Sequence, residues 1–170
     1  PVPLARELVR RVPNGLGLLV APGDRTDGRA LSQALDAVLP ARIAGYSRCE
    51  DRRGLVRRDA PTSLSTRGLR DVVHRTCTEV DATLGRSRVA LARDDGSALL
   101  VLGDSRRGRV AVLSTALDPE GSDLPLRPGF LPFFASLLGY LDGSASAAND
   151  RVLAGHTADL GEPGLVVRTP

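Results

Sequence analysis

Three apolar runs separated by turn signals constrain the fold of this chain more than any other feature. They lie in the stretch RVALARDDGSALLVLGDSRRGRVAVLSTAL and span residues 88–93, 98–102 and 109–114. Asp-Asp-Gly separates the first two runs, and a polar stretch bounded by glycines separates the second from the third. Asp-Gly between apolar runs is a strong hairpin signal. The runs are therefore predicted to form an antiparallel meander, with the third and most continuously apolar run deepest in the sheet.

Helical patterns flank this meander in the sequence. Apolar residues at helical spacing over residues 4–12, ending at an Asn-Gly pair, predict a helix followed by a buried strand over 16–21. Thr26 or Asp27 can cap a second helix. A broad apolar face over residues 130–141 predicts a third helix that covers the sheet. This order of helices and strands favours an α/β fold.

The rest of the chain is less well patterned. A short strand is expected over residues 41–46, a long surface loop or a partly helical segment over 47–68, and a strand with no cleanly apolar face over 71–80. The stretch DGSASAAND has the composition of a linker. We therefore expect an α/β domain over residues 1–145, incomplete at its N-terminal end, and a linker with the start of a β element over 146–170.

Composition argues against several classes of protein. The chain has 170 residues, a net charge of +3 and a pI near 9.5; all its basic residues are arginine, and 3% of its residues are aromatic. This mild basicity does not demand a nucleic-acid partner, and few aromatic side chains could stack on bases. No apolar run approaches the roughly 18 residues needed to cross a bilayer. The chain begins Pro-Val-Pro and contains no Met, so we expect it to be a piece of a longer protein.

Cysteine and histidine are the natural candidates for a nucleophile and its base. The chain has Cys49, Cys77, His74 and His156, at spacings that match neither a zinc site nor a disulfide framework. His74 and Cys77 are three residues apart, which on a strand places them on opposite faces. We expect each cysteine to be an inert, partly buried residue.

An acidic loop follows the last predicted strand. Asp118, Glu120 and Asp123 come after the strand that is expected to end at Ser114. Sheets of α/β proteins bind ligands at the carboxyl ends of their strands, and paired carboxylates serve glycoside hydrolysis or divalent-metal binding. In a structural alternative, Asp123 or Ser122 caps the next turn and Arg127 pairs with one of the carboxylates. These four charged residues are candidate ligand-binding residues, with no catalytic residue and no metal ligand assigned.

The loop VAPGDRTDG, residues 20–28, occupies a second position where α/β folds bind ligands. It follows an apolar strand and opens a helix, whose N-terminus attracts anions. Gly23 and Asp24 are therefore further candidate ligand-binding residues. The loop lacks the glycine-rich phosphate motifs, and Pro22 removes one backbone N–H group that an anion would use. A structural turn is the preferred interpretation.

Arginines cluster in two polar stretches of the sequence. The candidates for an anion-binding surface are Arg48, Arg52, Arg53, Arg57, Arg58, Arg106, Arg107 and Arg109. Such a surface would bind phosphate or anionic lipid. Acidic residues lie among these arginines, which favours a solvated face of mixed charge.

Two motifs resemble a known family. The stretch NGLGLLVAPGD resembles the helix-turn-strand signature GGGLLV.PGD, and GRVAVLSTALDPEGSDLPLRPGFLPFFASLLGYLDG resembles the strand-loop-helix that ends a class I glutamine amidotransferase-like domain. The similarity, over roughly residues 4–143, is to this domain in bacterial membrane proteins of BatA type, often found beside a von Willebrand factor type A domain. It implies a three-layer, flavodoxin-like α/β fold with an antiparallel C-terminal meander, in a parent protein anchored in the cell membrane.

The resemblance also implies what the chain does not do. Active members carry a cysteine on a tight elbow between strand and helix, with His and Glu downstream, whereas this chain has Ala21, Pro22 and Gly23 at the corresponding place. We therefore expect a non-catalytic interaction module without cofactor. Its expected partners are proteins or neighbouring domains of the same chain, with no nucleic acid, and membrane contact only through segments outside this chain. A hydrolase or metal-dependent enzyme built on the acidic loop is the alternative.

Overall fold

The computed structural model describes residues 2–82, 85 and 87–143. Its larger sheet has five strands in the order β1-β7-β6-β5-β3, and a separate sheet pairs β2 with β4. The strands are β1 (Leu18–Val20), β2 (Arg42–Arg53), β3 (Val56–Arg57), β4 (Val73–Asp81), β5 (Ser87–Ala92), β6 (Ala98–Ser105) and β7 (Gly108–Leu113). The α-helices are α1 (Val2–Arg11), α2 (Gly28–Leu35) and α3 (Phe130–Leu141), and short 3₁₀ helices span Val12–Asn14 and Leu124–Leu126.

The predicted meander forms the centre of the larger sheet. β5 pairs antiparallel with β6, and β6 pairs antiparallel with β7. In the Asp-Asp-Gly turn, Gly96 has φ +84°, a conformation that glycine adopts without the strain a side chain would add. β1 pairs with β7 in parallel, so the sheet is mixed. The residues from Val110 to Leu113 on β7 are all fully buried, as its continuous apolar run predicted.

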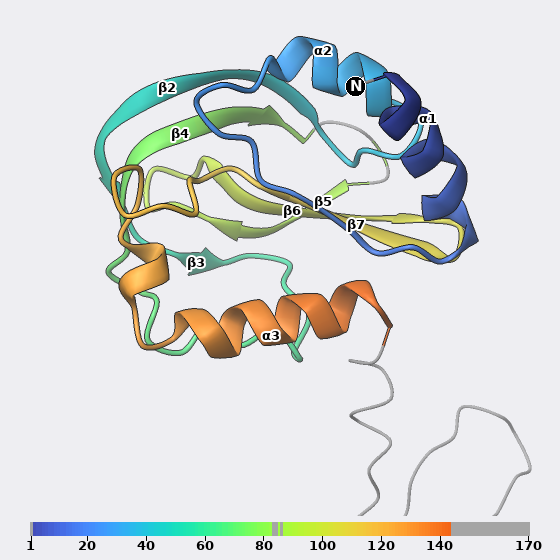
Figure 1. Cartoon of the computed structure of the whole chain (residues 1–170). Helices are drawn as coiled ribbons and strands as arrows, with labels where there is room; N and C mark the ends of the chain where they lie inside the picture. The colour runs from blue at the N-terminus through green and yellow to red at the C-terminus, as the bar shows by residue number, and fades with distance from the viewer. Residues whose placement is uncertain (1, 83–84, 86, 144–170) are drawn as a thin grey trace, which may run out of the picture.

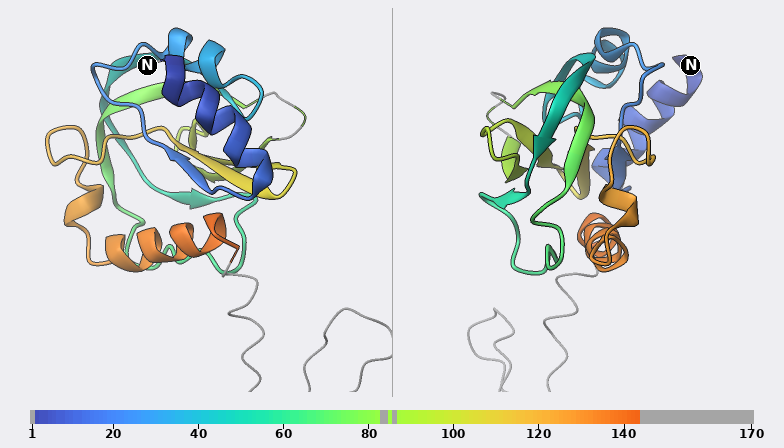
Figure 2. Two further views of the ribbon diagram at one scale, coloured as in Figure 1. Left: turned by 45° about the vertical axis from the view of Figure 1, so that its right-hand side comes forward. Right: turned by 90° about the vertical axis from the view of Figure 1, so that its left-hand side faces the viewer.

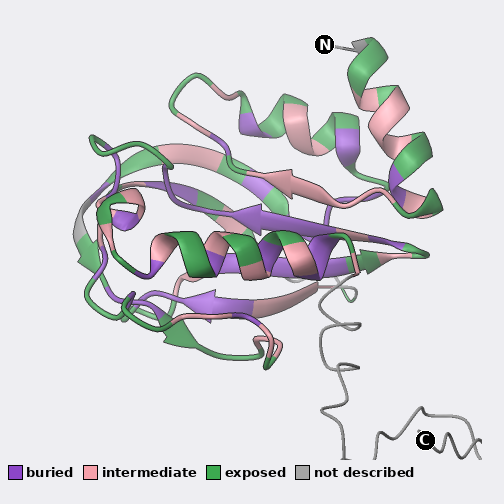
Figure 3. Ribbon diagram, turned by 60° about the horizontal axis from the view of Figure 1, so that its bottom comes forward, coloured by how far each residue is buried: buried purple, intermediate pink, exposed green. Residues whose placement is uncertain are grey.

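Helices cover both faces of this sheet, as Figure 1 shows. α1 and α2 pack on one face against Val101, Val110 and Val112, whose side chains alternate along β6 and β7 with those on the other face. α3 packs on that other face through Phe133 and Leu137. Buried residues therefore line the strands and the inner side of α3, while its outer side is exposed (Figure 3). The predicted α/β fold is confirmed at this level.

The loop predicted over residues 47–68 is wrong in part. β2 continues to Arg53 and pairs antiparallel with β4 along its length, with a register shift between Arg48 and Arg52. Figures 1 and 2 show the two strands side by side as long, curved ribbons. The charged residues Arg48, Arg52 and Arg53 hid the strand in the sequence, because they are exposed and leave no apolar alternation.

The predicted linker and β element over residues 146–170, together with His156, lie outside the described residues. The predicted domain over 1–145 is described up to residue 143, and its helices and strands share the cores on the two faces of the larger sheet. Within this described part, no helix is long and apolar enough to cross a membrane.

Candidate functional site

A cleft of about 830 Å³ lies where β1 and β7 end, at the edge of the sheet where α/β proteins bind ligands. The loops after these two strands form one wall, and the middle of the β2–β4 sheet forms the other. The lining residues are Gly23, Asp24, Tyr46, Arg48, Arg75, Thr76, Asp118, Glu120 and Gly121. Four of the six residues proposed from the sequence as ligand-binding therefore meet here: Gly23, Asp24, Asp118 and Glu120.

The acidic loop is fixed to β4 by backbone hydrogen bonds. The carbonyl oxygen of Gly121 accepts from the N–H groups of Arg75 (2.9 Å) and Thr76 (3.0 Å). Asp118 Oδ1 accepts from the N–H of Gly121 at 2.8 Å, which closes the turn. A Cβ atom at Gly121 would lie 2.3 Å from Ala116 Cβ, so the close approach requires glycine. This turn places the side chain of Glu120 at the rim of the cleft, where it is exposed.

The loop after β1 is a structural turn. The N–H of Gly23 donates to Thr26 Oγ1 at 3.1 Å, and the N–H of Thr26 donates to the Gly23 carbonyl at 3.0 Å. Asp27 caps α2, because its Oδ1 accepts from the N–H of Ala30 at 3.0 Å. A carboxylate thus already occupies the end of the helix that would attract an anion. Asp24 is left exposed at the mouth of the cleft.

Asp123 and Arg127 lie outside the cleft and hold the chain in place. Asp123 Oδ1 accepts from the N–H of Val73 at 2.8 Å, and its Oδ2 accepts from Arg127, which also donates to the carbonyl of Asp71. Burial alone would raise the pKa of Asp123, but the hydrogen bonds from Arg127 and Val73 bring that pKa below its ordinary value. The pair confirms that Arg127 binds a carboxylate of the loop, and it fixes the chain's path toward α3. Asp123 makes no side-chain capping bond to the 3₁₀ helix that follows; Ser122 Oγ instead accepts from the N–H of Leu124 at 3.1 Å.

The carboxylates of the acidic loop are therefore divided between two environments. Asp118 and Glu120 face the cleft, whereas Asp123 is held by its own ion pair. Among the residues that the structure describes, no group of three or more His, Cys, Asp or Glu side chains is placed to hold a metal ion. The loop does not supply the converging carboxylates that divalent-metal chemistry requires.

The expectation of two inert free cysteines is wrong. Cys49 and Cys77 form a disulfide that joins β2 to β4, with their Cα atoms 5.6 Å apart. The register places Ser47 opposite Cys77, and the irregularity that follows Arg48 brings Cys49 across to it. Both cysteines are buried, each 3% exposed. Because β2 was not predicted beyond residue 46, the sequence offered no reason to place the two cysteines on neighbouring strands.

Buried polar side chains gather around His74 on β4, and the sequence did not predict their burial. His74 is fully buried, with its Nε2 3.2 Å from the carbonyl oxygen of Gly54 and its Nδ1 2.8 Å from Thr115 Oγ1. A carbonyl only accepts, so Nε2 carries the proton and Nδ1 accepts from the threonine hydroxyl. Burial, helped by the nearby charge of Arg93, lowers the pKa of His74 to about 4. The imidazole is therefore neutral at physiological pH.

This buried histidine predicts a specific loss of stability in acid. In the unfolded chain the pKa of His74 is close to 6.5, so the unfolded state binds more protons than the folded state between pH 6.5 and about 4. The free energy of unfolding should fall by about 3 kcal/mol as the pH drops through this window. Urea unfolding at pH 7, 6, 5 and 4 measures it.

The matched control for this titration is the only other histidine in the chain. His74→Gln should remove the loss between pH 6.5 and 4, whereas His156→Gln should leave it unchanged. The carboxyl groups with lowered pKa values, Asp123, Asp95 and Glu7, begin to lose their stabilising effect near pH 5, so they overlap only the acidic end of this window. A wild-type stability that is flat between pH 6.5 and 4 would contradict a neutral, buried His74.

The candidate anion-binding arginines do not form one surface. Arg52 pairs with Asp95 at 3.2 Å. Arg57 donates to the carbonyl groups of Leu64 and Pro61 and so holds the loop after β3. Arg109 lies on β7, where its guanidinium is 4.8 Å from the ring centroid of Tyr140. Each of these side chains is thus committed to a different part of the fold.

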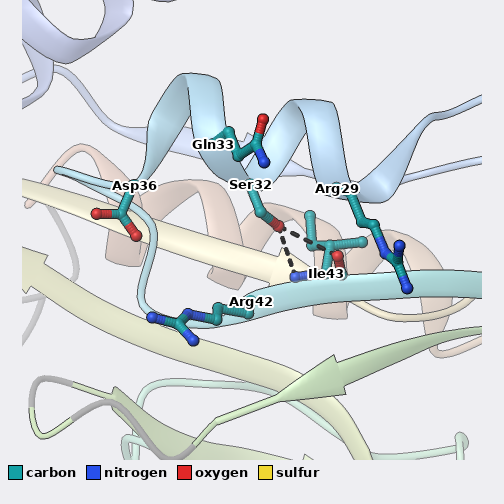
Figure 4. A pocket seen from close by; sticks show the side chains of 6 residues that line it. All are labelled: Arg29, Ser32, Gln33, Asp36, Arg42 and Ile43. Carbon is teal, nitrogen blue, oxygen red and sulfur yellow. Dashed lines mark hydrogen bonds between the residues drawn. The ribbon is translucent and has the colours of Figure 1, made fainter.

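A second, smaller cleft of about 450 Å³ lies between α2 and the start of β2 (Figure 4). Ser32 is at its centre, where Oγ accepts from the N–H of Ile43 at 2.7 Å and donates to its carbonyl at 3.2 Å. These two bonds attach the helix to the end of the strand. The hydroxyl of Ser32 is therefore not available to a ligand. The other polar side chains that line this cleft are those of Arg29, Gln33, Asp36 and Arg42. We interpret this cleft as a consequence of the packing of α2 against β2.

No protein-family model and no curated protein matches the chain. Among solved structures, it is similar to the cytoplasmic proteins STM3548 and STM1381 of Salmonella typhimurium, with TM-scores of 0.67 and 0.63 at 19% and 17% identity. These alignments cover 81% and 85% of this chain, which spans about three fifths of either protein (59% and 60%). The β-galactosidase of Rahnella sp. R3 matches 80% of this chain over 20% of its own length, with a TM-score of 0.57 at 12% identity. At these identities the likeness concerns the fold alone.

Proposed function

We propose that the chain is a non-catalytic interaction module of class I glutamine amidotransferase-like type, within a larger membrane-anchored protein of the bacterial cell envelope. The observation that carries this proposal is the cleft between the β2–β4 sheet and the loops after β1 and β7. Its position is the ligand-binding edge of an α/β sheet, while the cysteine chemistry of active amidotransferases has no counterpart there.

The cysteines support the absence of glutaminase chemistry. The chain contains two cysteines, and both are joined in the disulfide between β2 and β4. The thiolate is the nucleophilic form of cysteine, so a disulfide-bonded residue cannot attack a substrate amide. At the turn after β1, where the family resemblance locates the nucleophile, the chain has Ala21 and Pro22.

The charges in the cleft favour a protein surface as its occupant. Asp24, Asp118 and Glu120 supply negative charge on the loop side, while Arg48 and Arg75 supply positive charge on the strand side. A site of mixed sign complements the mixed charges of a polypeptide better than the uniform charge of a phosphate or nucleic acid. Tyr46 adds an aromatic ring, and tyrosine is enriched at protein interfaces. We assign the cleft to a protein partner or a neighbouring domain of the same chain.

The disulfide also supports the proposed cell-envelope location. Disulfides persist in oxidising compartments such as the bacterial periplasm and are rare in the reducing cytosol. The bond between Cys49 and Cys77 is buried and joins two neighbouring strands, which is the arrangement of a structural bond. Hydrophobic spans of about 20 residues in the full reading frame are the expected anchor.

Site-specific photo-crosslinking in the parent protein tests this assignment. A photoreactive phenylalanine analogue in place of Tyr46 lies in the cleft, and the same analogue in place of Leu4, which is 66% exposed on α1, serves as the control. We expect position 46 to cross-link to one defined polypeptide, identified by mass spectrometry as a partner or as another domain of the chain. The triple variant D24N/D118N/E120Q should lower that yield several-fold. Equal cross-linking from both positions, or none from position 46, would reject the cleft as the interface.

A further inference from the structure

Arg93 carries a charge into the interior of the domain. It is 1% exposed and follows β5, where its guanidinium reaches across to the ends of β6 and β7. Nη1 donates to Ser97 Oγ at 3.1 Å and to the carbonyl of Ala98 at 3.0 Å, while Nη2 donates to both oxygens of Ser114. Burial lowers the pKa of Arg93 to about 10, which still leaves the side chain protonated at neutral pH.

This guanidinium has no direct counter-ion in the described part of the chain. All four of its hydrogen-bond acceptors are neutral oxygens, and its Nε–H has no acceptor. Buried charges in proteins are normally paired, because the cost of removing an ion from water is otherwise uncompensated. The negative charge of Asp95 acts on Arg93 without a direct contact, because its carboxylate accepts from Ser97 at 2.6 Å and pairs with Arg52.

Arg93 lines a cavity of about 290 Å³ between the β2–β4 sheet and the β5–β6 hairpin. The other lining residues are Ser47, Arg52, Cys77, Thr78, Glu79, Val80, Ser97 and Ala98. None of these lining residues is among those of the large cleft. The two sites are therefore separate.

We propose that this cavity binds a small oxyanion of the carboxylate class, with Arg93 as its buried counter-charge. The bound carboxylate supplies the negative charge that the guanidinium lacks. A volume of 290 Å³ is at the lower end of ligand pockets, which suits a small carboxylic acid and excludes a nucleotide. Glu79, exposed at the rim, disfavours ligands with several negative charges. The site is independent of any protein partner in the large cleft.

Titration with defined anions tests the proposal on the disulfide-bonded protein. The probes are sodium acetate, sodium succinate and sodium phosphate, with sodium chloride as reference, at constant ionic strength. The readout is the arginine Nε–H region of the ¹H–¹⁵N NMR spectrum, where the Arg93 signal is identified by its loss in Arg93→Gln or, where that variant does not fold, in Arg93→Lys, which retains the charge. We expect acetate to shift this one signal saturably, and to bind at least tenfold more tightly than phosphate. Tighter binding of phosphate, or a non-saturating shift equal to that of chloride, would overturn the assignment.

Two variants separate the site from general effects of charge. Arg107→Gln removes the same charge from an exposed position and should leave acetate affinity within twofold of wild type. Ser47→Phe retains Arg93 but fills the cavity from its exposed side, and it should weaken acetate binding at least tenfold. Ser47→Phe decides the question even where Arg93→Gln does not fold. Wild-type affinity in Ser47→Phe, or an equal loss in Arg107→Gln, would contradict the proposal.

Discussion

Replacing Cys49 and Cys77 together by alanine is expected to lower the free energy of unfolding by about 3 to 4 kcal/mol. The disulfide closes a loop across a sequence separation of 28 residues, and the unfolded chain regains the conformational freedom of that loop when the bond is absent. The folded state keeps the β2–β4 pairing, which is made by backbone hydrogen bonds. Guanidinium unfolding of wild type and double variant measures the difference.

The reductant supplies the matched control for this result. Wild-type protein should lose a similar amount of stability when reduced, whereas the double alanine variant should unfold at the same denaturant concentration with and without reductant. Thiol titration of the denatured, unreduced protein should give no free thiol, and two after reduction. Two free thiols before reduction, or a wild type indifferent to reductant, would contradict the disulfide.

Phe133→Ala is expected to cost about 3 to 5 kcal/mol of the free energy of unfolding. Phe133 is 0% exposed and joins α3 to the side chains of β6 and β7 on that face of the sheet. Truncation removes the buried ring and leaves a cavity that a rigid sheet cannot close. Chemical denaturation, checked by the circular dichroism of the folded state, measures the loss.

Leu131 on the same helix provides the control, because its side chain is 75% exposed. Leu131→Ala should change the free energy of unfolding by no more than about 0.5 kcal/mol. A large effect at Leu131 would mean that the outer side of α3 is covered in the isolated domain. A small effect at Phe133 would mean that α3 does not close the core.

The elements that the sequence predicted well are those in which local signals agree with the tertiary environment. The Asp-Asp-Gly turn needs the positive φ that Gly96 adopts, and the apolar run of β7 lies where both sheet faces are covered. Asp27, one of the two capping residues expected before the second helix, caps α2. In each case the pattern that a few neighbouring residues form is also the pattern that the fold requires.

The features missed from the sequence depend on contacts between distant segments. The second half of β2 is a strand because β4 lies beside it, and the disulfide depends on the same register. His74 and Arg93 are polar residues whose burial comes from tertiary packing. Local sequence patterns predict that a polar side chain is exposed. Only the arrangement of the two sheets shows that His74 and Arg93 are buried.

The candidate site was predicted in its position and only in part in its residues. Gly23, Asp24, Asp118 and Glu120 follow strands whose ends meet at one edge of the sheet, and that edge was expected to bind ligands. The arginines and the tyrosine of the opposite wall come from β2 and β4, and no local pattern in these segments indicates that the strands close the cleft. Pairing of Arg127 with one of the loop's carboxylates was part of the structural alternative, and the structure shows that its partner is Asp123.

Glutamine hydrolysis, measured together with labelling by an electrophilic glutamine analogue, tests most directly the claim that this module is not an enzyme. The disulfide-bonded protein should release glutamate at the rate of a protein-free blank, and intact-mass analysis should find no label. After reduction, Cys49 and Cys77 should be labelled slowly and without selectivity, still with no release of glutamate. The proposed function would be contradicted if the protein hydrolysed glutamine and the analogue labelled one cysteine in a time-dependent way. In that case excess glutamine should slow both the labelling and the loss of activity.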